Sequence, residues 1–301
     1  MNSSSQTVTV PTALAFRKAA EFCELTKPRI VLMVLITACV GFYAGSGRVP
    51  DYVLLIQMLI GTALAAGGTL TLNQLIERKT DAMMERTRRR PLPDGRVLPQ
   101  DALWFGALLT LAGLGYLVMT VNWLSALVAA AITASYLLAY TPMKRMSSLC
   151  VPVGAVPGAL PPVIGWVAAR GELSVDAWVL FAIMFLWQIP HTLAIAYLYR
   201  DDFAKAGIKF LPVIEPDLES TNRQILVHCG ALLAVSLLPT LIGMAGAIYF
   251  IAAFLLGVGF LAGGISLVFA PTRAGARRLL FASLIYLPAL LLMMALDRVP
   301  L

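Results

Sequence analysis

Charged residues are scarce in this sequence. Only 13% of the 301 residues are Asp, Glu, Lys or Arg, whereas a soluble domain carries about 25%. Hydrophobic residues make up 59% of the chain, and the mean hydropathy is +0.82. So few polar side chains cannot cover a globule in water, which excludes an ordinary soluble domain. The composition therefore predicts a membrane protein with several spans.

The sequence also lacks the residue pairs of common metal and disulfide sites. Its four cysteines, at positions 23, 39, 150 and 229, include no Cys-x-x-Cys pair, and only two histidines occur. This spacing argues against a zinc site, an iron–sulfur cluster and a disulfide framework. We interpret the cysteines as small apolar residues of the protein interior.

Long apolar runs dominate what is present. A helix that crosses a bilayer needs about 17–25 residues, and nine runs reach this length. We therefore expect an all-α integral membrane protein with an N-terminal segment (1–29), a nine-helix domain (30–296) and a short external tail (297–301). The nine runs cover approximately residues 30–47, 53–76, 101–120, 122–140, 149–168, 176–199, 225–243, 247–269 and 277–296.

The distribution of Lys and Arg predicts the orientation. With the N-terminus in the cytoplasm, all but three of the 23 basic residues lie on the inner side, and only Arg48, Arg170 and Arg298 lie outside. Inner loops of membrane proteins carry this excess of positive charge. The sequence thus predicts an N-in, C-out protein of the cell (inner) membrane. The net charge of +7 then reflects topology, and we do not interpret it as nucleic-acid binding.

Two long inner loops, residues 77–100 and 200–224, follow the second and the sixth spans. They lie four helices apart, and each opens with a polar cluster that continues the helix before it. This layout predicts two four-helix pseudo-repeats with a ninth helix added. It also predicts that both clusters face the cytoplasm.

Three oxygen-bearing side chains stand at the inner end of the second span. Asn73, Glu77 and Asp81 are four residues apart, so successive members are rotated by only about 40° and share one helix face. Mg²⁺ prefers carboxylates together with phosphate oxygens. The pattern predicts a magnesium site, and the alternative is a helix end that carries ordinary interfacial acids.

Arginines follow this line of acids at once, at positions 78, 86, 88, 89 and 90. Guanidinium groups bind phosphates through two parallel hydrogen bonds. Carboxylates and arginines together at a membrane face indicate a lipid diphosphate as substrate. The positive-inside rule alone is the alternative explanation of the arginines.

A second polar cluster follows the sixth span. Tyr199, Arg200, Asp201 and Asp202 open it, and Lys205 comes shortly after. Asp202 occupies the position in the second half of the chain that matches the acids of the first half. We therefore predict that Asp202 belongs to a second metal site.

These clusters resemble the UbiA superfamily of intramembrane prenyltransferases, and within it the protohaem farnesyltransferase branch. The resemblance covers about residues 22–296, and its blocks come in the family order. Besides the line of Asn73, Glu77 and Asp81, the blocks are residues 25–29 (LTKPR), 86–92 (RTRRRPL), 140–145 (YTPMKR), 158–166 (GALPPVIGW), 187–191 (WQIPH) and 202–212 (DFAKAGIKFLP).

The resemblance implies a reaction and a set of roles. Farnesyl diphosphate would ionise to an allylic cation, a vinyl group of protohaem IX would attack it, and water would complete a hydroxyethylfarnesyl group. The bundle would protect the cation from water before that step. The implied metal ligands are Asn73, Glu77, Asp81 and Asp202, with Mg²⁺ as cofactor, and the implied diphosphate-binding residues are Arg78, Arg86, Arg90, Lys144 and Lys205.

The acceptor side is expected around His191, which follows Pro190 deep in the sixth span. An ionisable residue inside a membrane is a functional candidate by default, so His191 either contacts the haem or is a hydrogen-bonded packing residue. Eleven residues separate it from Asp202, which predicts a shared helix face and an axial separation of about 16 Å. Tyr140 and Tyr199 are expected near the same substrates, beside the acceptor and the cation or at the diphosphate.

Two other functions remain open from the sequence. One is a UbiA-type enzyme that prenylates an aromatic quinone precursor, and the absence of Asp at position 74 speaks against it. The other is a transporter or assembly factor with the same fold, which would not need two diphosphate motifs. Membrane lipid is an expected partner in every case, and the enzymatic interpretation adds a haem-modifying or oxidase-assembly protein as a possible one.

Overall fold

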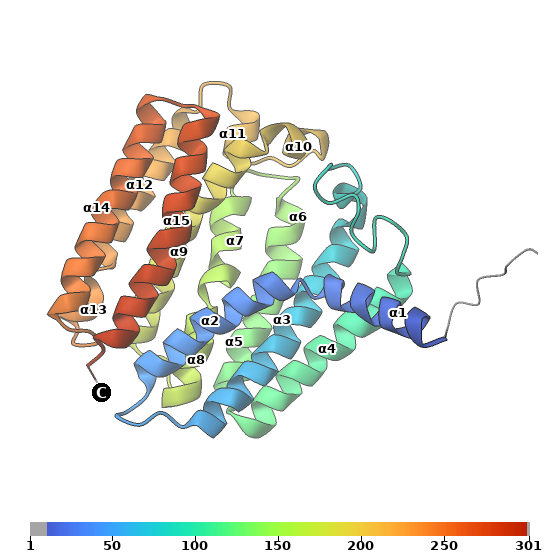
Figure 1. Cartoon of the computed structure of the whole chain (residues 1–301), viewed down its shortest axis with the longest axis horizontal. Helices are drawn as coiled ribbons and strands as arrows, with labels where there is room; N and C mark the ends of the chain where they lie inside the picture. Colours follow the sequence, from blue (N-terminus) through green and yellow to red (C-terminus); the bar gives the residue numbers. More distant parts are fainter. Residues whose placement is uncertain (1–10, 300–301) are drawn as a thin grey trace, which may run out of the picture.

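The computed structural model describes residues 11–299, and it is mainly helical over that range (Figure 1). Nine helical segments of the described range are long and apolar enough to cross a membrane, which confirms the predicted all-α membrane fold and its nine spans. These segments are α2 (Pro28–Gly45), α3 (Tyr52–Asp81), α4 (Pro99–Thr120), α5–α6 (Trp123–Met143), α7–α8 (Cys150–Arg170), α9 (Val175–Leu198), α12–α13 (Glu219–Leu241), α14 (Ala247–Phe269) and α15 (Arg273–Leu296).

Short helices connect or precede the spans. They are α1 (Pro11–Leu25), α10 (Arg200–Lys205) and α11 (Leu211–Ile214). Figure 1 shows α10 and α11 at the same end of the bundle as the loop that follows α3. We call this the polar end, defined by residues 77–98 and 199–218. Residues 1–10 of the predicted N-terminal segment and 300–301 of the predicted tail lie outside the described residues.

Helix α1 is an element that the hydropathy pattern did not predict. Its last residue, Leu25, is fully buried in a small cluster with Leu92, Val97 and Ala102. Between α1 and α2, Lys27 has a left-handed backbone conformation (φ 52°). Pro28 disfavours the right-handed helical region for the residue before it, so α1 and α2 cannot form one helix. The break turns the Lys27 side chain into the bundle.

The fourth and fifth spans are interrupted, the fourth near the polar end and the fifth at its middle. The fourth consists of α5 (Trp123–Ala134), the π-helical segment η1 (Ser135–Tyr140) and α6 (Thr141–Met143). The Thr141 hydroxyl donates to the carbonyl oxygen of Tyr136 (2.7 Å) within this wider turn. The fifth span consists of α7 (Cys150–Ala159) and α8 (Pro161–Arg170), separated at Leu160. Consecutive prolines at 161 and 162 remove helical donors and explain that break.

Small residues allow the helices to approach closely. A Cβ atom on Gly113 of α4 would lie 2.3 Å from the backbone nitrogen of Ala65 on α3, and one on Gly165 of α8 would lie 1.9 Å from the carbonyl oxygen of Ala38 on α2. Only glycine fits at both contacts. Because lipid gives no hydrophobic drive for association, packing of this kind holds membrane helices together.

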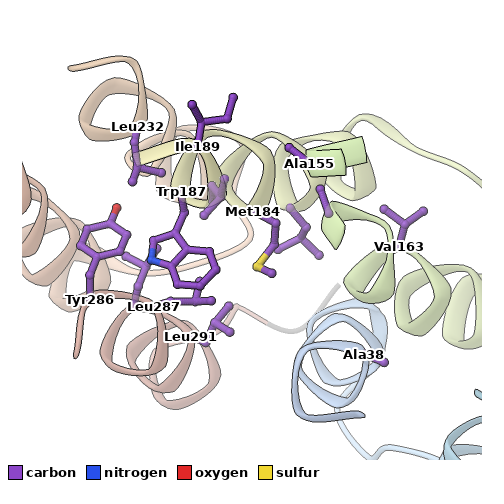
Figure 2. Packing of buried hydrophobic residues seen from close by; sticks show 14 of the residues in the cluster. Ala38, Ala155, Val163, Met184, Trp187, Ile189, Leu232, Tyr286, Leu287 and Leu291 are labelled. Atoms are coloured by element: carbon purple, nitrogen blue, oxygen red, sulfur yellow. The ribbon is translucent and has the colours of Figure 1, made fainter. Parts of the chain in front are cut away.

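The core extends from one half of the bundle to the other, with α9 in contact with α7, α12 and α15. Figure 2 shows Trp187 of α9 beside Tyr286, Leu287 and Leu291 of α15. The Trp187 indole nitrogen donates to the carbonyl oxygen of Ser283 (2.9 Å). The hydrogen bond satisfies a polar group that would be costly to bury alone.

One expectation about the sixth span is wrong. Helix α9 ends at Leu198, and Asp202 belongs to the separate short helix α10. Tyr199 between them has φ −111° and ψ 25°, which is outside the helical region. His191 and Asp202 are therefore not on one continuous helix, and the shared face and the 16 Å axial separation do not apply. The seventh span also begins earlier than predicted, at Glu219.

Candidate active site

The line of acids at the end of α3 is buried and paired with cations. Asn73 is 0% exposed and Asp81 is 2% exposed, so neither depends on water for its partners. Each member of the line accepts a hydrogen bond from a basic side chain of a different segment. The pairs are Lys27 Nζ to Asn73 Oδ1 (3.0 Å), Lys144 Nζ to Glu77 Oε1 (2.7 Å) and Arg90 Nη1 to Asp81 Oδ2 (2.7 Å).

The interrupted fourth span supports this arrangement. The Asn73 amide donates to the Thr141 hydroxyl (3.1 Å), which fixes the amide so that its oxygen faces Lys27. The Lys144 ammonium also lies over the Tyr140 ring, 4.4 Å from the ring centre, a distance typical of a cation–π contact. The π-helical turn therefore places Thr141, Tyr140 and Lys144 on the side of α3 that carries the acids.

Three basic groups and two carboxylates lie together in this pocket. Burial, and then the guanidinium of Arg90, lower the pKa of Lys27 to about 7. Burial alone would lower the pKa of Lys144, but the facing Tyr140 and Glu77 raise it, and the net direction is upward. Lys27 is hydrogen-bonded to the neutral Asn73 amide and, with a pKa of about 7, is only partly charged at neutral pH. A bound anion would favour its charged form.

The loop of the second half closes one side of the pocket. A cavity of about 160 Å³ lies next to Glu77 and Lys144, and Ile208 from the loop after α10 also lines it. The backbone nitrogen of Lys209 donates to the carbonyl oxygen of Lys144 (2.8 Å). The Arg86 guanidinium lies 5.8 Å from the centre of the Tyr199 ring. These contacts join the two polar clusters, although they are far apart in the sequence.

An apolar cavity of about 130 Å³ lies deeper in the bundle. Its lining comes from α2, α3, α5, η1, α7 and α8, and the α3 residues in it lie on the face that carries Asn73 and Glu77. Thr69 and Thr133 form a hydrogen bond between their hydroxyls (2.8 Å) in its wall. The residues that line it are Ile30, Val34, Thr62, Ala65, Ala66, Thr69, Leu70, Ala129, Ile132, Thr133, Tyr136, Pro157, Gly158, Pro161 and Ile164.

A cation-rich pocket and an apolar cavity along the same face of α3 suit a lipid with an anionic head. Comparison with known proteins agrees, because residues 34–285 match the model of the UbiA prenyltransferase family. The chain belongs to the UbiA prenyltransferase family. The predicted resemblance is thereby confirmed.

Relatives named protoheme IX farnesyltransferase match this UbiA-family chain over most of its length. The protein of Solibacter usitatus is 46% identical over 92% of this chain and 98% of its own. The protein of Myxococcus xanthus is 43% identical over 94% of this chain and 96% of its own. These matches support the predicted branch within the family.

Solved structures share the fold of the UbiA-family chain at low sequence identity. A structure of digeranylgeranylglyceryl phosphate synthase covers 93% of this chain and 98% of its own, with a TM-score of 0.78 and 17% identity. A UbiA homologue from Archaeoglobus fulgidus bound to DMAPP and Mg²⁺ covers 91% of this chain and 99% of its own, with a TM-score of 0.64 and 15% identity. Likeness at this identity establishes the fold and does not transfer individual residues.

Three further residues of the predicted site in the UbiA-family chain are Arg78, Asp202 and Lys205. The Arg78 side chain donates to the carbonyl oxygen of Leu75 on its own helix (2.8 Å). Asp202 is partly exposed and Lys205 is exposed on α10. Among the residues that the structure describes, no three His, Cys, Asp or Glu side chains form a group that could hold a metal ion. Asn73 and phosphate oxygens would have to complete any such site.

His191 faces the other half of the bundle. Its Nδ1 lies 2.7 Å from the Ser283 hydroxyl of α15, and its ring stacks on Trp187 with 4.7 Å between ring centres. The Ser283 hydroxyl donates its single proton to the carbonyl oxygen of Leu280 (2.6 Å). With the Ser283 proton directed to the Leu280 carbonyl, Nδ1 of His191 donates to Ser283. In that tautomer Nε2 keeps a lone pair, as in a metal-ligating histidine.

Sequence reasoning missed Lys27 and Thr141 as site residues, although both lie in quoted motifs. Lys27 is the nearest cation to Asn73, and Thr141 holds the Asn73 amide. A lysine directly before the proline that opens a span is a usable signal, because the proline disfavours the helical region for the residue before it. The partners of that lysine depend on how the helices pack and leave no local pattern.

Proposed function

We propose that this UbiA-family protein transfers the farnesyl group of farnesyl diphosphate to a vinyl group of protohaem IX, with addition of water, and so forms haem O. One observation carries the proposal: the buried cation-rich pocket and the apolar cavity lie along the same face of α3. A prenyl diphosphate has the matching anionic head and apolar tail. The names of the relatives supply the acceptor.

The donor set fits a magnesium–diphosphate complex. Asn73, Glu77 and Asp81 offer oxygen atoms on one helix face, which suits the preference of Mg²⁺, and Asp202 is our candidate for a second metal site. When bound, Mg²⁺ would supply Lewis-acid neutralisation of the leaving diphosphate. The related structure with DMAPP and Mg²⁺ supports the choice of metal.

The basic residues of the chain bind and stabilise the leaving group. Lys27, Lys144 and Arg90 donate to Asn73, Glu77 and Asp81. With Mg²⁺ held by those oxygen atoms, the three cations would be available to bind the diphosphate oxygens. Their positive charge stabilises the negative charge that develops as the allylic C–O bond breaks. Arg86 at the rim extends the binding surface.

The apolar wall protects the allylic cation that remains. Tyr136 lines the cavity and Tyr140 lies beside Lys144, so both rings are near the break between head and tail. Aromatic faces stabilise cations, and the lipid-facing bundle excludes water until the vinyl group has attacked. His191 positions the haem through its free Nε2.

The pocket should open to the cytoplasm, on the inner side of an N-in, C-out protein in the cell (inner) membrane. The excess of basic residues at the polar end supports this orientation. A haem-modifying or oxidase-assembly protein would then receive the product, since haem O is too apolar to diffuse freely through water.

The proposal is tested with membranes that contain the protein, protohaem IX, farnesyl diphosphate and Mg²⁺. We expect a new haem whose mass includes a hydroxyethylfarnesyl group, and we expect EDTA to abolish it. Membranes that lack the protein are the control. Diphosphate release only with an aromatic acceptor would assign the reaction to quinone-precursor prenylation, and turnover with neither acceptor would favour transport or assembly.

A further inference from the structure

The apolar cavity lies along the same face of α3 as Asn73, Glu77 and Asp81, on the side away from the polar end. Thr62, Ala66, Thr69 and Asn73 follow one another at intervals of three or four residues, so they share one helix face. The first three line the cavity, and Asn73 belongs to the pocket above it. The distance along the helix from Asn73 to Thr62 is about 16 Å. An extended farnesyl chain has a comparable length, and a geranylgeranyl chain is longer.

The volume of the cavity suits the end of a prenyl chain. At about 130 Å³ it is close in size to a cavity of about 150 Å³ that binds benzene, so it accommodates one five-carbon isoprene unit. The first isoprene unit, next to the diphosphate, would lie along the helical turn between Thr69 and Asn73, about 6 Å of α3. By length, three units span the path of about 16 Å from Asn73 to the bottom of the cavity at Thr62.

The bottom is closed by tightly packed side chains. Helix α3 runs toward the polar end and α8 runs away from it, so Thr62 and Ile164 are the deepest lining residues of these helices. Met58 lies one turn below Thr62 and is fully buried. The Thr62 hydroxyl donates to the Met58 sulfur (3.6 Å). Beside this layer, α2 and α8 approach too closely at Gly165 to leave a passage.

We propose that the layer formed by Thr62, Ile164 and Met58 is an end stop that limits the prenyl donor to three isoprene units. The inference rests on the proposed function, because it takes the apolar cavity as the prenyl site. The stop is rigid because Thr62 and Ile164 are buried and the hydrogen bond between Thr69 and Thr133 ties the walls above it.

Shortening the cavity is the first test. Ala66 lines the cavity, and Ala66→Leu fills the space of the last isoprene unit. With equal amounts of geranyl, farnesyl and geranylgeranyl diphosphate, we expect the wild type to favour the farnesyl donor about tenfold or more. We expect the product ratio of Ala66→Leu to shift about tenfold toward geranyl. Ala63→Leu on the same helix, outside the lining, is the matched control and should keep the wild-type ratio.

Lengthening the cavity is the second test. Met58→Ala removes the side chain below Thr62, and we expect transfer from geranylgeranyl diphosphate to rise about tenfold relative to farnesyl. Ile164→Val is a milder change that keeps the experiment usable if Met58→Ala reduces the yield of folded protein. Folding is checked by size-exclusion chromatography in detergent. Unchanged donor ratios in folded Ala66→Leu and in the folded lengthening variant would overturn the end stop.

A binding measurement separates this inference from the proposed reaction. Thermal stabilisation of the purified protein is measured with non-hydrolysable geranyl, farnesyl and geranylgeranyl thiolodiphosphates and Mg²⁺. Strongest stabilisation by the farnesyl compound supports the end stop even if haem is not the acceptor. Equal stabilisation by all three compounds, with haem O still formed, would refute the end stop and leave the proposed function intact.

Discussion

Helices α3 and α9 both lead to acidic residues at the polar end, but the two groups of acids differ in burial and in their partners. Helix α3 continues unbroken through Asp81 and buries its acids against cations from three other segments. Helix α9 stops at Leu198, and its acids lie on the short helix α10. The Asp201–Arg273 pair there has side chains that are 75% and 70% exposed, against 14% and 13% for Glu77 and Lys144.

The difference shows where charge has its largest effect. Buried pairs interact through a medium of low polarisability and cannot exchange partners with water, whereas exposed pairs are screened. We therefore expect substitutions at the end of α3 to be much more damaging than matched substitutions on α10. The following experiments test this contrast, from the largest expected effect to the smallest.

Asp81→Asn should reduce prenyl transfer by about 100-fold or more. The change keeps the shape of the side chain but removes the charge that would bind metal, and it leaves the Arg90 guanidinium unpaired. Activity is measured as haem product per amount of protein inserted in the membrane. Asp201→Asn is the matched control and should retain most activity. Equal losses of activity in Asp81→Asn and Asp201→Asn would contradict the expected difference between buried and exposed acids.

Lys27→Met should reduce kcat/KM by about 10- to 100-fold, because groups that orient a metal ligand typically contribute that much. Lys27 donates to Asn73 from a left-handed turn that no other cation of the described residues shares. Lys18→Met, on the exposed part of α1, is the control. Steady-state kinetics with varied farnesyl diphosphate provide the measurement. Wild-type kinetics in Lys27→Met would show that Asn73 needs no cation.

A pair of double-mutant cycles compares the two regions directly. Glu77→Gln with Lys144→Met should give a coupling energy of about 2 kcal/mol or more, as interacting buried groups do. Asp201→Asn with Arg273→Met should give less than about 1 kcal/mol, and salt should reduce it further. The quantity measured is the apparent free energy of unfolding in detergent. Similar coupling energies would contradict the difference in burial.

Asp202→Asn should have the smallest effect on activity, about tenfold, and a higher concentration of Mg²⁺ should recover part of it. Asp202 is partly exposed, so water can replace one of its contacts to a metal. The activity of the variant is titrated with Mg²⁺ beside the wild type. A loss that no concentration of Mg²⁺ reduces would place Asp202 in another role, and no loss at all would exclude a second metal site there.

Local sequence patterns were sufficient for several of these features. Hydropathy predicted the nine spans because length and composition alone decide whether a helix can cross a bilayer. The spacing of Asn73, Glu77 and Asp81 predicted their shared face because the helical period is constant. The same period gave a wrong prediction for His191 and Asp202. The helix ends at Leu198 and the backbone of Tyr199 is not helical, so the helical spacing does not apply beyond it.

By itself, the sequence determined that this is a nine-span helical membrane protein with a line of acids and a cluster of arginines at one end. The tertiary structure alone decided which cation meets which acid. Lys27 and Asn73 are 46 residues apart, and Lys144 and Glu77 are 67 residues apart, so no periodicity links them. It also decided where the apolar cavity ends, at Thr62 and Ile164. Periodicity and hydropathy describe one helix at a time, whereas pairing and cavities arise only when several helices pack together.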